Sequence, residues 1–95
     1  MSELRFAWDP AKAASNARKH GVSFEEARTV FWDDAALFME DPDHSDQEDR
    51  FVLLGLSSTA RVLVVVHCYR EKPDTIRLIS ARKATRGERE RYTRR

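Results

Sequence analysis

The chain has 95 residues, of which 41% are hydrophobic and 35% charged, and its formal net charge at pH 7 is +1. This length suits a single domain over residues 1–95, because two separate cores would each bury too little apolar surface. The composition excludes wholesale disorder, and the longest aliphatic run, Val62–Val66, is too short to cross a bilayer.

Compartment and redox state follow from two further features. The chain does not start with a basic and then apolar signal segment, so we expect a cytoplasmic protein without membrane attachment. Cys68 is the single cysteine, which excludes an internal disulfide and a cysteine-cluster metal site. We expect a buried, reduced thiol.

Positive and negative charges are separated along the chain. Residues 1–49 carry five Lys or Arg against twelve Asp or Glu, a net charge of −7, whereas residues 50–95 carry twelve against four, a net charge of +8. Either the two halves neutralise each other in the fold, or the second half presents a basic surface to a polyanion. Both interpretations are open at this point.

The first half predicts a short strand and two helices. Residues 4–9 alternate as a strand, and Asp9 then precedes a proline at the first helical position, which predicts a helix over residues 10–20. A second helix lies within residues 22–32 and begins at the capping box formed by Ser23 and Glu26, and its apolar residues recur at helical spacing. We expect the two helices to form a hairpin.

The second half predicts strands and a terminal helix. Residues 36–40 suit a short strand, and residues 41–49 form an acidic, turn-rich surface loop. Three segments rich in β-branched residues predict an antiparallel meander: residues 50–57, 61–70 and 75–81. The expected fold class is α+β, with an antiparallel sheet covered on one face by the N-terminal helical hairpin and a short C-terminal helix over residues 85–92.

One histidine and three cations are the first candidates for chemistry. Alternation along its strand puts His67 at the end of an apolar row, where a histidine is more often structural than catalytic. An antiparallel neighbour would bring Arg77, Arg82 and Lys83 beside it, however, and an imidazole near fixed cations suits phosphate chemistry. Such a set suffices for metal-free RNA cleavage, in which the ribose 2′-hydroxyl is the nucleophile.

The rest of the basic C-terminal segment has two interpretations. Glu88 and Glu90 can pair with Arg91 and Arg94 at helical spacing, which would make the helix an ordinary solvated one. That pairing leaves a cluster that predicts a polyanion site where guanidinium groups converge on phosphates: Arg77, Arg82, Lys83, Arg86 and Arg89.

Other positions carry weaker signals. Arg18, Lys19 and His20 lie in the last turn of the first helix, where cations complement the helix dipole. They have a functional role only if that turn lies at the rim of the basic surface. Residues 41–49 lack the glycine and the terminal glutamate of a calcium loop, and the three glycines form no phosphate loop. We therefore expect no metal and no cofactor.

Four segments together resemble the BrnT toxins of bacterial toxin-antitoxin operons, which are similar in fold to the RelE and ParE toxins. The resemblance runs essentially end to end, and its segments are FAWDPAKAASNARKHGVSFEEARTVF (6–31), DPDHSDQEDRFVLLG (41–55), VLVVVH (62–67) and IRLISARKATRGERERY (76–92). It implies a RelE-like fold and a ribonuclease that inhibits translation. It also implies a neutralising BrnA partner that binds operator DNA, in a complex of two toxins with two antitoxins.

The resemblance also suggests site residues, segment by segment. The matching segments contain the catalytic candidates His67, Arg77, Arg82, Lys83 and Tyr92. The general base is an inference from side-chain chemistry and not from the resemblance: neutral His67 would take the 2′-hydroxyl proton, although Tyr92 or a carboxylate such as Glu48 is an alternative base. The expected RNA contacts are Arg70, Arg86, Arg89 and Lys19.

Two rival functions are consistent with the same sequence. The chain could be a nucleic-acid or partner-binding module without turnover, or it could act by binding gyrase, as on the ParE branch of the same fold. Cleavage assays separate the first rival from an enzyme, and a supercoiling assay tests the second.

Overall fold

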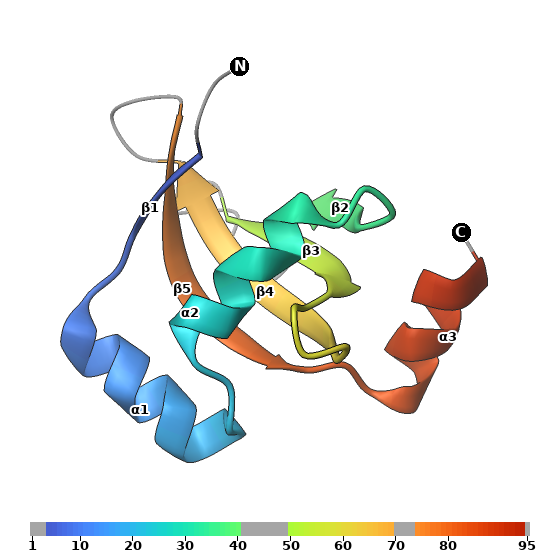
Figure 1. The fold of residues 1–95 in the computed structure, drawn as a ribbon, viewed down its shortest axis with the longest axis horizontal. Helices are drawn as coiled ribbons and strands as arrows, with labels where there is room; N and C mark the ends of the chain where they lie inside the picture. The colour runs from blue at the N-terminus through green and yellow to red at the C-terminus, as the bar shows by residue number, and fades with distance from the viewer. Residues whose placement is uncertain (1–3, 41–49, 70–73, 95) are drawn as a thin grey trace.

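The structure is a computed structural model that describes residues 4–40, 50–69 and 74–94. Figure 1 shows its strands in one curved sheet, with α1 and α2 on one side and α3 beside one end. The elements in chain order are β1 (Arg5–Ala7), α1 (Pro10–His20), α2 (Phe24–Ala27), the 3-10 helix η1 (Arg28–Trp32), β2 (Leu37–Glu40), β3 (Phe51–Leu56), β4 (Val62–Tyr69), β5 (Thr75–Lys83) and α3 (Arg86–Arg94). The fold is mixed α+β, as expected.

The predicted meander is confirmed, but the sheet is not wholly antiparallel. Its strand order is β1-β5-β4-β3-β2, and β2 to β5 pair antiparallel in sequence. β1 instead lies parallel to β5, with Arg5 opposite Thr75 and Ala7 opposite Arg77. Alternation predicts a strand without naming its partner, and the packing of α1 on β5 carries β1 to that edge.

The caps that the sequence predicts at both helix starts are present. The Asp9 carboxylate accepts a hydrogen bond from the Ala11 backbone N–H, and Ser23 accepts one from the Glu26 N–H at 3.0 Å. The second helix is shorter than expected, because after Ala27 the chain tightens into η1.

The 3-10 helix lies directly on the sheet. η1 packs closely on β3 at Gly55, where an added Cβ would come within 2.8 Å of a Val30 methyl. Since α1 lies mainly against β5 and η1 against β3, the two helices share a sheet face more than they contact each other. A helical hairpin is therefore not confirmed.

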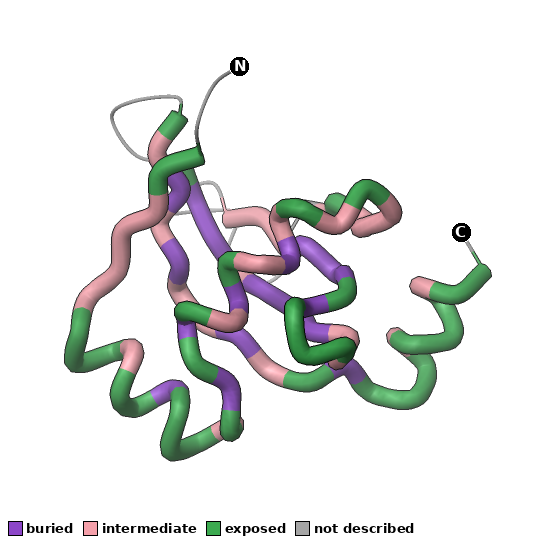
Figure 2. The backbone as a smooth tube through the Cα atoms, viewed as in Figure 1, coloured by how far each residue is buried: buried purple, intermediate pink, exposed green. Residues whose placement is uncertain are grey.

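Apolar side chains are buried on both faces of the sheet. Figure 2 shows the buried residues gathered in β3, β4 and β5, whereas α3 is exposed over most of its length. The core between the sheet and the first helices contains Val22, Phe24, Ala27, Val30, Leu53, Leu63, Val65, Ile76, Leu78 and Ala81. A smaller cluster lies on the α3 side and contains Leu54, Val64 and Ala84, with Leu37, Met39, Val52, Val62 and Tyr92 packed against it.

A single carboxylate ties the first helices to the β3–β4 turn. Glu26 accepts hydrogen bonds from the Ser57 and Thr59 hydroxyls and from the Arg61 guanidinium. The Arg61 guanidinium also donates to the Gly21 carbonyl at the end of α1. The bonds from Arg61 hold the pKa of Glu26 at about 2, well below its ordinary value.

Replacing Glu26 with glutamine should therefore destabilise the fold. The amide keeps the size but loses the charge, leaving the part-buried Arg61 without a counter-ion, so we expect a loss of about 2–3 kcal/mol in urea unfolding. Glu25→Gln, on an exposed residue of the same turn, is the matched control and should stay within about 0.5 kcal/mol of wild type. Equal stability of the two variants would contradict the role given to Glu26.

Candidate functional site

The start of α3 is built around Glu88. Its carboxylate accepts from the Thr85 backbone N–H at 2.8 Å while the Thr85 hydroxyl accepts from the Glu88 N–H at 3.2 Å, a capping box. The same carboxylate receives two bonds from Arg82, at 2.9 and 3.0 Å. Arg82 lowers the pKa of Glu88 to about 2, and in return Glu88 raises the pKa of Arg82.

This arrangement changes the expected pairing along α3. Glu88 and Arg91 do not form the predicted helical pair, because Glu88 is bound to Arg82 instead. Glu90 pairs with Arg86 at 3.6 Å and with Arg94 at 4.0 Å. Within the described part of the chain, Arg91 has no ion-pair partner.

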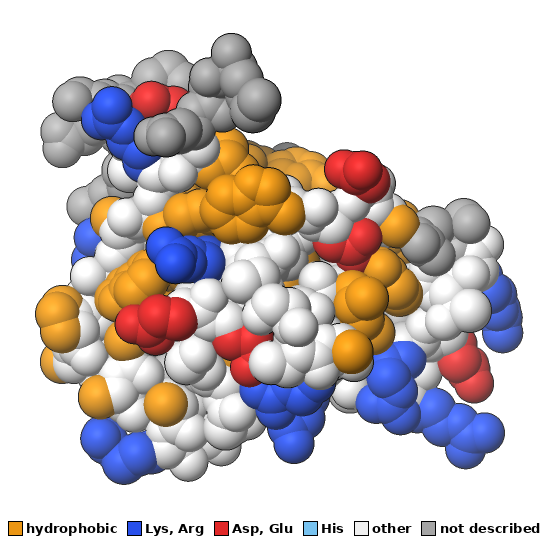
Figure 3. All heavy atoms as spheres, viewed as in Figure 1, with side chains coloured by type: hydrophobic (Ala, Val, Ile, Leu, Met, Phe, Trp, Pro, Cys, Tyr) orange, Lys and Arg blue, Asp and Glu red, His pale blue; other side chains and the backbone are white. Residues whose placement is uncertain are grey.

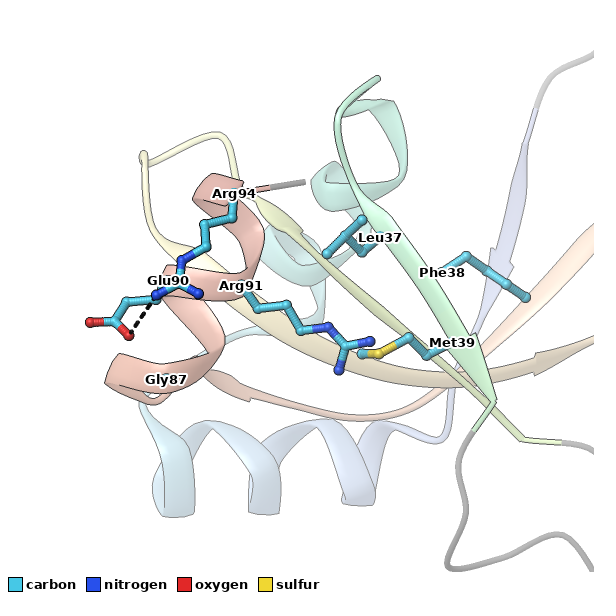
Figure 4. A pocket seen from close by; sticks show the side chains of 7 residues that line it. All are labelled: Leu37, Phe38, Met39, Gly87, Glu90, Arg91 and Arg94. Atoms are coloured by element: carbon cyan, nitrogen blue, oxygen red, sulfur yellow. Dashed lines mark ion pairs between the residues drawn. The ribbon is translucent and has the colours of Figure 1, made fainter.

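Arg91 lies in a groove between α3 and the edge strand β2. Figure 4 shows its side chain extending from the helix toward Met39 across the groove, with Leu37 and Phe38 on the same strand. The volume of the groove is about 560 Å³, and from α3 it is also lined by Gly87, Glu90 and Arg94. It combines an apolar wall with guanidinium groups.

A second hollow lies on the other flank of α3, against the start of β4. It is lined by Val62, Arg86, Arg89, Glu90, Thr93 and Arg94. The Arg89 guanidinium donates to the Ala84 carbonyl at 2.9 Å, which holds that side chain along the start of the helix. Arginines therefore line α3 on both flanks.

Cations continue from α3 toward the end of α1. Figure 3 shows Lys and Arg side chains gathered along the lower edge of the molecule, below the ends of α1 and β5 and beside α3. Lys83 is the exposed last residue of β5, and exposed Lys19 belongs to the last turn of α1. We call Lys19, Lys83, Arg86 and Arg89 together the basic rim.

His67 lies inside the protein. Its side chain is fully buried, and its ring centroid is 4.8 Å from that of Phe31 and 5.6 Å from that of Tyr69. Nδ1 is 3.3 Å from the Val65 carbonyl, and Nε2 has no hydrogen-bond partner among the described residues. Burial lowers the pKa of His67 to about 4, so the imidazole is neutral at pH 7.

The expected cluster of His67 with three cations does not form. His67 pairs with Leu78 on the helix-covered face, whereas Arg77 and Arg82 lie opposite Cys68 and Val64 and thus on the other face. Adjacent strand residues point to opposite faces, and a bulge at Val66/His67 shifts the register between β4 and β5. Pairing alone could not predict which cations share a face with the imidazole.

Tyr92 holds α3 against the rest of the fold. Its ring packs against the small cluster under α3, and its hydroxyl donates to the Asp33 carboxylate at 2.6 Å. Asp33 also accepts from the Leu56 N–H, so Tyr92 attaches α3 to the end of β3. Two other expected residues, Arg70 and Glu48, lie outside the described residues.

The described residues hold no group of three His, Cys, Asp or Glu side chains placed to bind a metal ion. No helix among them is long and apolar enough to cross a membrane.

The burial of His67 predicts a specific pH dependence of stability. Its pKa is about 4 in the folded state against about 6.5 in the unfolded chain, so the unfolded state binds more protons in this window and stability falls as pH drops through it. His67→Leu should remove this loss, which is on the order of 3 kcal/mol, in urea unfolding measured from pH 7 to pH 4. Val65→Ala, which keeps the imidazole, is the control and should lower stability by about the same amount at every pH. If the stability of H67L fell with pH in parallel with that of the wild type, the pH dependence would not come from buried His67.

Comparison with known proteins places this geometry in a family. Residues 8–88 match the model of a family described as the ribonuclease toxin BrnT of type II toxin-antitoxin systems. The chain is also similar to the crystal structure of the Brucella abortus ribonuclease toxin BrnT, with a TM-score of 0.65 and 21% sequence identity over 88% of this chain and 100% of the Brucella chain. No curated protein sequence matches. Because the family match spans most of its length, the chain belongs to the BrnT family of ribonuclease toxins of type II toxin-antitoxin systems.

Proposed function

We propose that this BrnT-family toxin is a metal-independent endoribonuclease that inhibits translation by cutting RNA along the surface formed by α3 and the basic rim. The observation that carries the proposal is the surplus of guanidinium groups on α3. Glu88 is occupied by Arg82 and Glu90 is shared by two arginines, which leaves Arg91 uncompensated beside an apolar wall. Cations next to apolar and aromatic side chains suit a strand of phosphates and bases.

The cations divide into binding and positioning groups. Lys83, Arg86 and Arg89 bind phosphates at the rim and stabilise the phosphorane, as guanidinium and ammonium groups do in phosphoryl chemistry. Arg82 and Tyr92 act indirectly, because their bonds to Glu88 and Asp33 hold α3 in place. These two are positioning residues in this proposal, and not catalytic ones as the sequence suggested.

The outer cations extend the RNA path. Arg77 lies on the same face of the sheet as the cluster under α3, five residues before Arg82 on β5, and Lys19 lies at the far end of the basic rim. Fully buried His67 has no route to a ribose hydroxyl in this conformation, so the proposal assigns it no proton transfer.

The toxin acts in the cytoplasm and is neutralised by a BrnA-like antitoxin. Two toxins and two antitoxins form the inactive complex, which binds operator DNA through the antitoxin. Support for this part of the proposal is the family alone, since a toxin of a type II system implies a protein antitoxin.

The chemistry is tested by incubating the purified chain with a labelled single-stranded RNA in excess chelator. Cleavage of RNA, with an all-deoxy version of the same strand left intact, is expected because the 2′-hydroxyl is the nucleophile. Intact RNA in chelator would contradict the metal-free mechanism. Loss of gyrase supercoiling activity in the presence of the protein, without RNA cleavage, would instead favour a ParE-like toxin.

The groove is tested through Arg91. Arg91→Ala should weaken binding of a non-cleavable 2′-O-methyl RNA. The slope of log affinity against log salt concentration should become shallower by about 0.7, because one phosphate contact is lost. Binding is measured by fluorescence anisotropy from 50 to 200 mM salt. Lys12→Ala, which removes an exposed cation from the first half of α1, is the matched control, and identical slopes in the two variants would exclude Arg91 from the RNA path.

A further inference from the structure

One histidine outside the core lies at the end of the basic rim. His20 is the last residue of α1, and its side chain is half-buried between exposed neighbours. Ala13, Asn16 and His20 recur at helical spacing and are the most sheltered residues of the helix. They therefore share the face that α1 turns toward the sheet.

The position of that face is set by buried Asn16. Its side-chain amide donates to the Ala81 carbonyl at 2.9 Å, and its carbonyl oxygen accepts from the Ala81 N–H at 3.1 Å. The same amide group also donates to the Val22 carbonyl after the helix. These bonds fix the register of α1 on β5.

The ends of α1 and β5 converge on the start of β4. Arg61, just before β4, donates to the Gly21 carbonyl at 3.2 Å. On the other side of β4, Leu63 pairs with Lys83, and the Val62 carbonyl accepts from the Ala84 N–H. From the level of the Asn16–Ala81 hydrogen bonds, α1 and β5 therefore both run toward the end of the sheet where β4 begins.

Element geometry then brings His20 to the level of Lys83. From Asn16 to His20 the helix advances about 6 Å, and from Ala81 to Lys83 the strand advances about 6.6 Å. Ala81 and Lys83 also point to the same face of β5, since they pair with Val65 and Leu63. His20 and Lys83 therefore lie at the same end of the helix-covered face, where β5 leads into α3.

We propose that His20 is the general base of the ribonuclease and that Lys83 is its general acid. Imidazole is the side chain that takes up and releases a proton at neutral pH, and within the described part of the chain the other histidine is the buried His67. This inference rests on the proposed function, and it names the residues that move the protons in that reaction.

The step balances with these two groups. Neutral His20 takes the proton of the ribose 2′-hydroxyl as the O2′–P bond forms, and the P–O5′ bond breaks as the Lys83 ammonium gives a proton to the departing 5′-oxygen. The products are a 2′,3′-cyclic phosphate and a 5′-hydroxyl, and no redox change or co-reactant is involved.

The charged groups around His20 suit this role. Arg61 is engaged by Glu26 and by the Gly21 carbonyl, so its charge is compensated. Lys19 and Lys83 are exposed cations without an ion-pair partner in the described ranges, so both can face the phosphates of an RNA strand. Glu26, bound to Arg61, is unavailable as a competing base.

The test compares His20→Gln with Arg18→Gln, an exposed residue of the same helical turn. Single-turnover cleavage of a labelled RNA is followed from pH 5 to pH 8, beside binding of its 2′-O-methyl version. We expect H20Q to cleave at least about 100-fold more slowly and to lose the rise of rate with pH, while its RNA affinity and unfolding midpoint stay within about twofold and about 2 °C of wild type. R18Q should match wild type in rate and pH profile.

Lys83 and the reaction products give the second part of the test. Lys83→Gln should slow cleavage of RNA more than it slows cleavage of a substrate with a 5′-thio leaving group, which needs no protonation. If the wild type cleaves RNA and H20Q cleaves it at the same rate, the inference is overturned and the proposed function stands. If the wild-type protein leaves RNA intact, both are overturned. If H20Q loses RNA affinity by the same factor as its cleavage rate, His20 binds RNA and is not the base.

Discussion

The carboxylate of Glu88 connects the sheet to the C-terminal helix, and the functional surface depends on that connection. It caps α3 through the Thr85 N–H and binds Arg82 at the end of β5 with two parallel hydrogen bonds. A two-point contact of this kind sets orientation as well as distance. Because the carboxylate is fully used, Arg91 one turn later has no counter-ion in the described part of the chain and lies in the groove against β2.

The separation of charge along the sequence is only partly cancelled in the fold. Glu26 of the acidic half binds Arg61 of the basic half, and Asp33 accepts from Tyr92. Both contacts hold elements together rather than cover α3. The acidic residues nearest the arginines of α3 are the helix's own Glu88 and Glu90, which are fewer than the cations beside them. A net basic edge remains, as Figure 3 shows.

The two described histidines differ in solvent exposure because one lies inside the sheet and the other lies at the end of a helix. His67 is in the middle of the sheet among aromatic rings, where burial keeps it neutral and its Nε2 finds no partner. Because aromatic rings surround the imidazole in place of water, His67 cannot exchange protons with solvent or substrate. His20 ends a helix at the margin of the sheet and stays partly open to solvent. The same side chain therefore has a packing role in one place and a proposed catalytic role in the other.

Local chemistry in the sequence determined the helix starts, the three strands of the meander and the basic C-terminal helix. Asp9, Ser23 and the β-branched runs act on their near neighbours, so their effects follow from residue order. Tertiary structure alone decided the parallel pairing of β1, the face on which Arg77 and Arg82 lie, and the partner of Glu88. Each of these depends on contacts between distant segments or on a one-residue bulge, and a strand's side chains change face with every residue. For the same reason, the sequence placed Lys19 and His20 in one helical turn but could not place that turn relative to β5, because the position of α1 depends on the tertiary hydrogen bonds between Asn16 and Ala81.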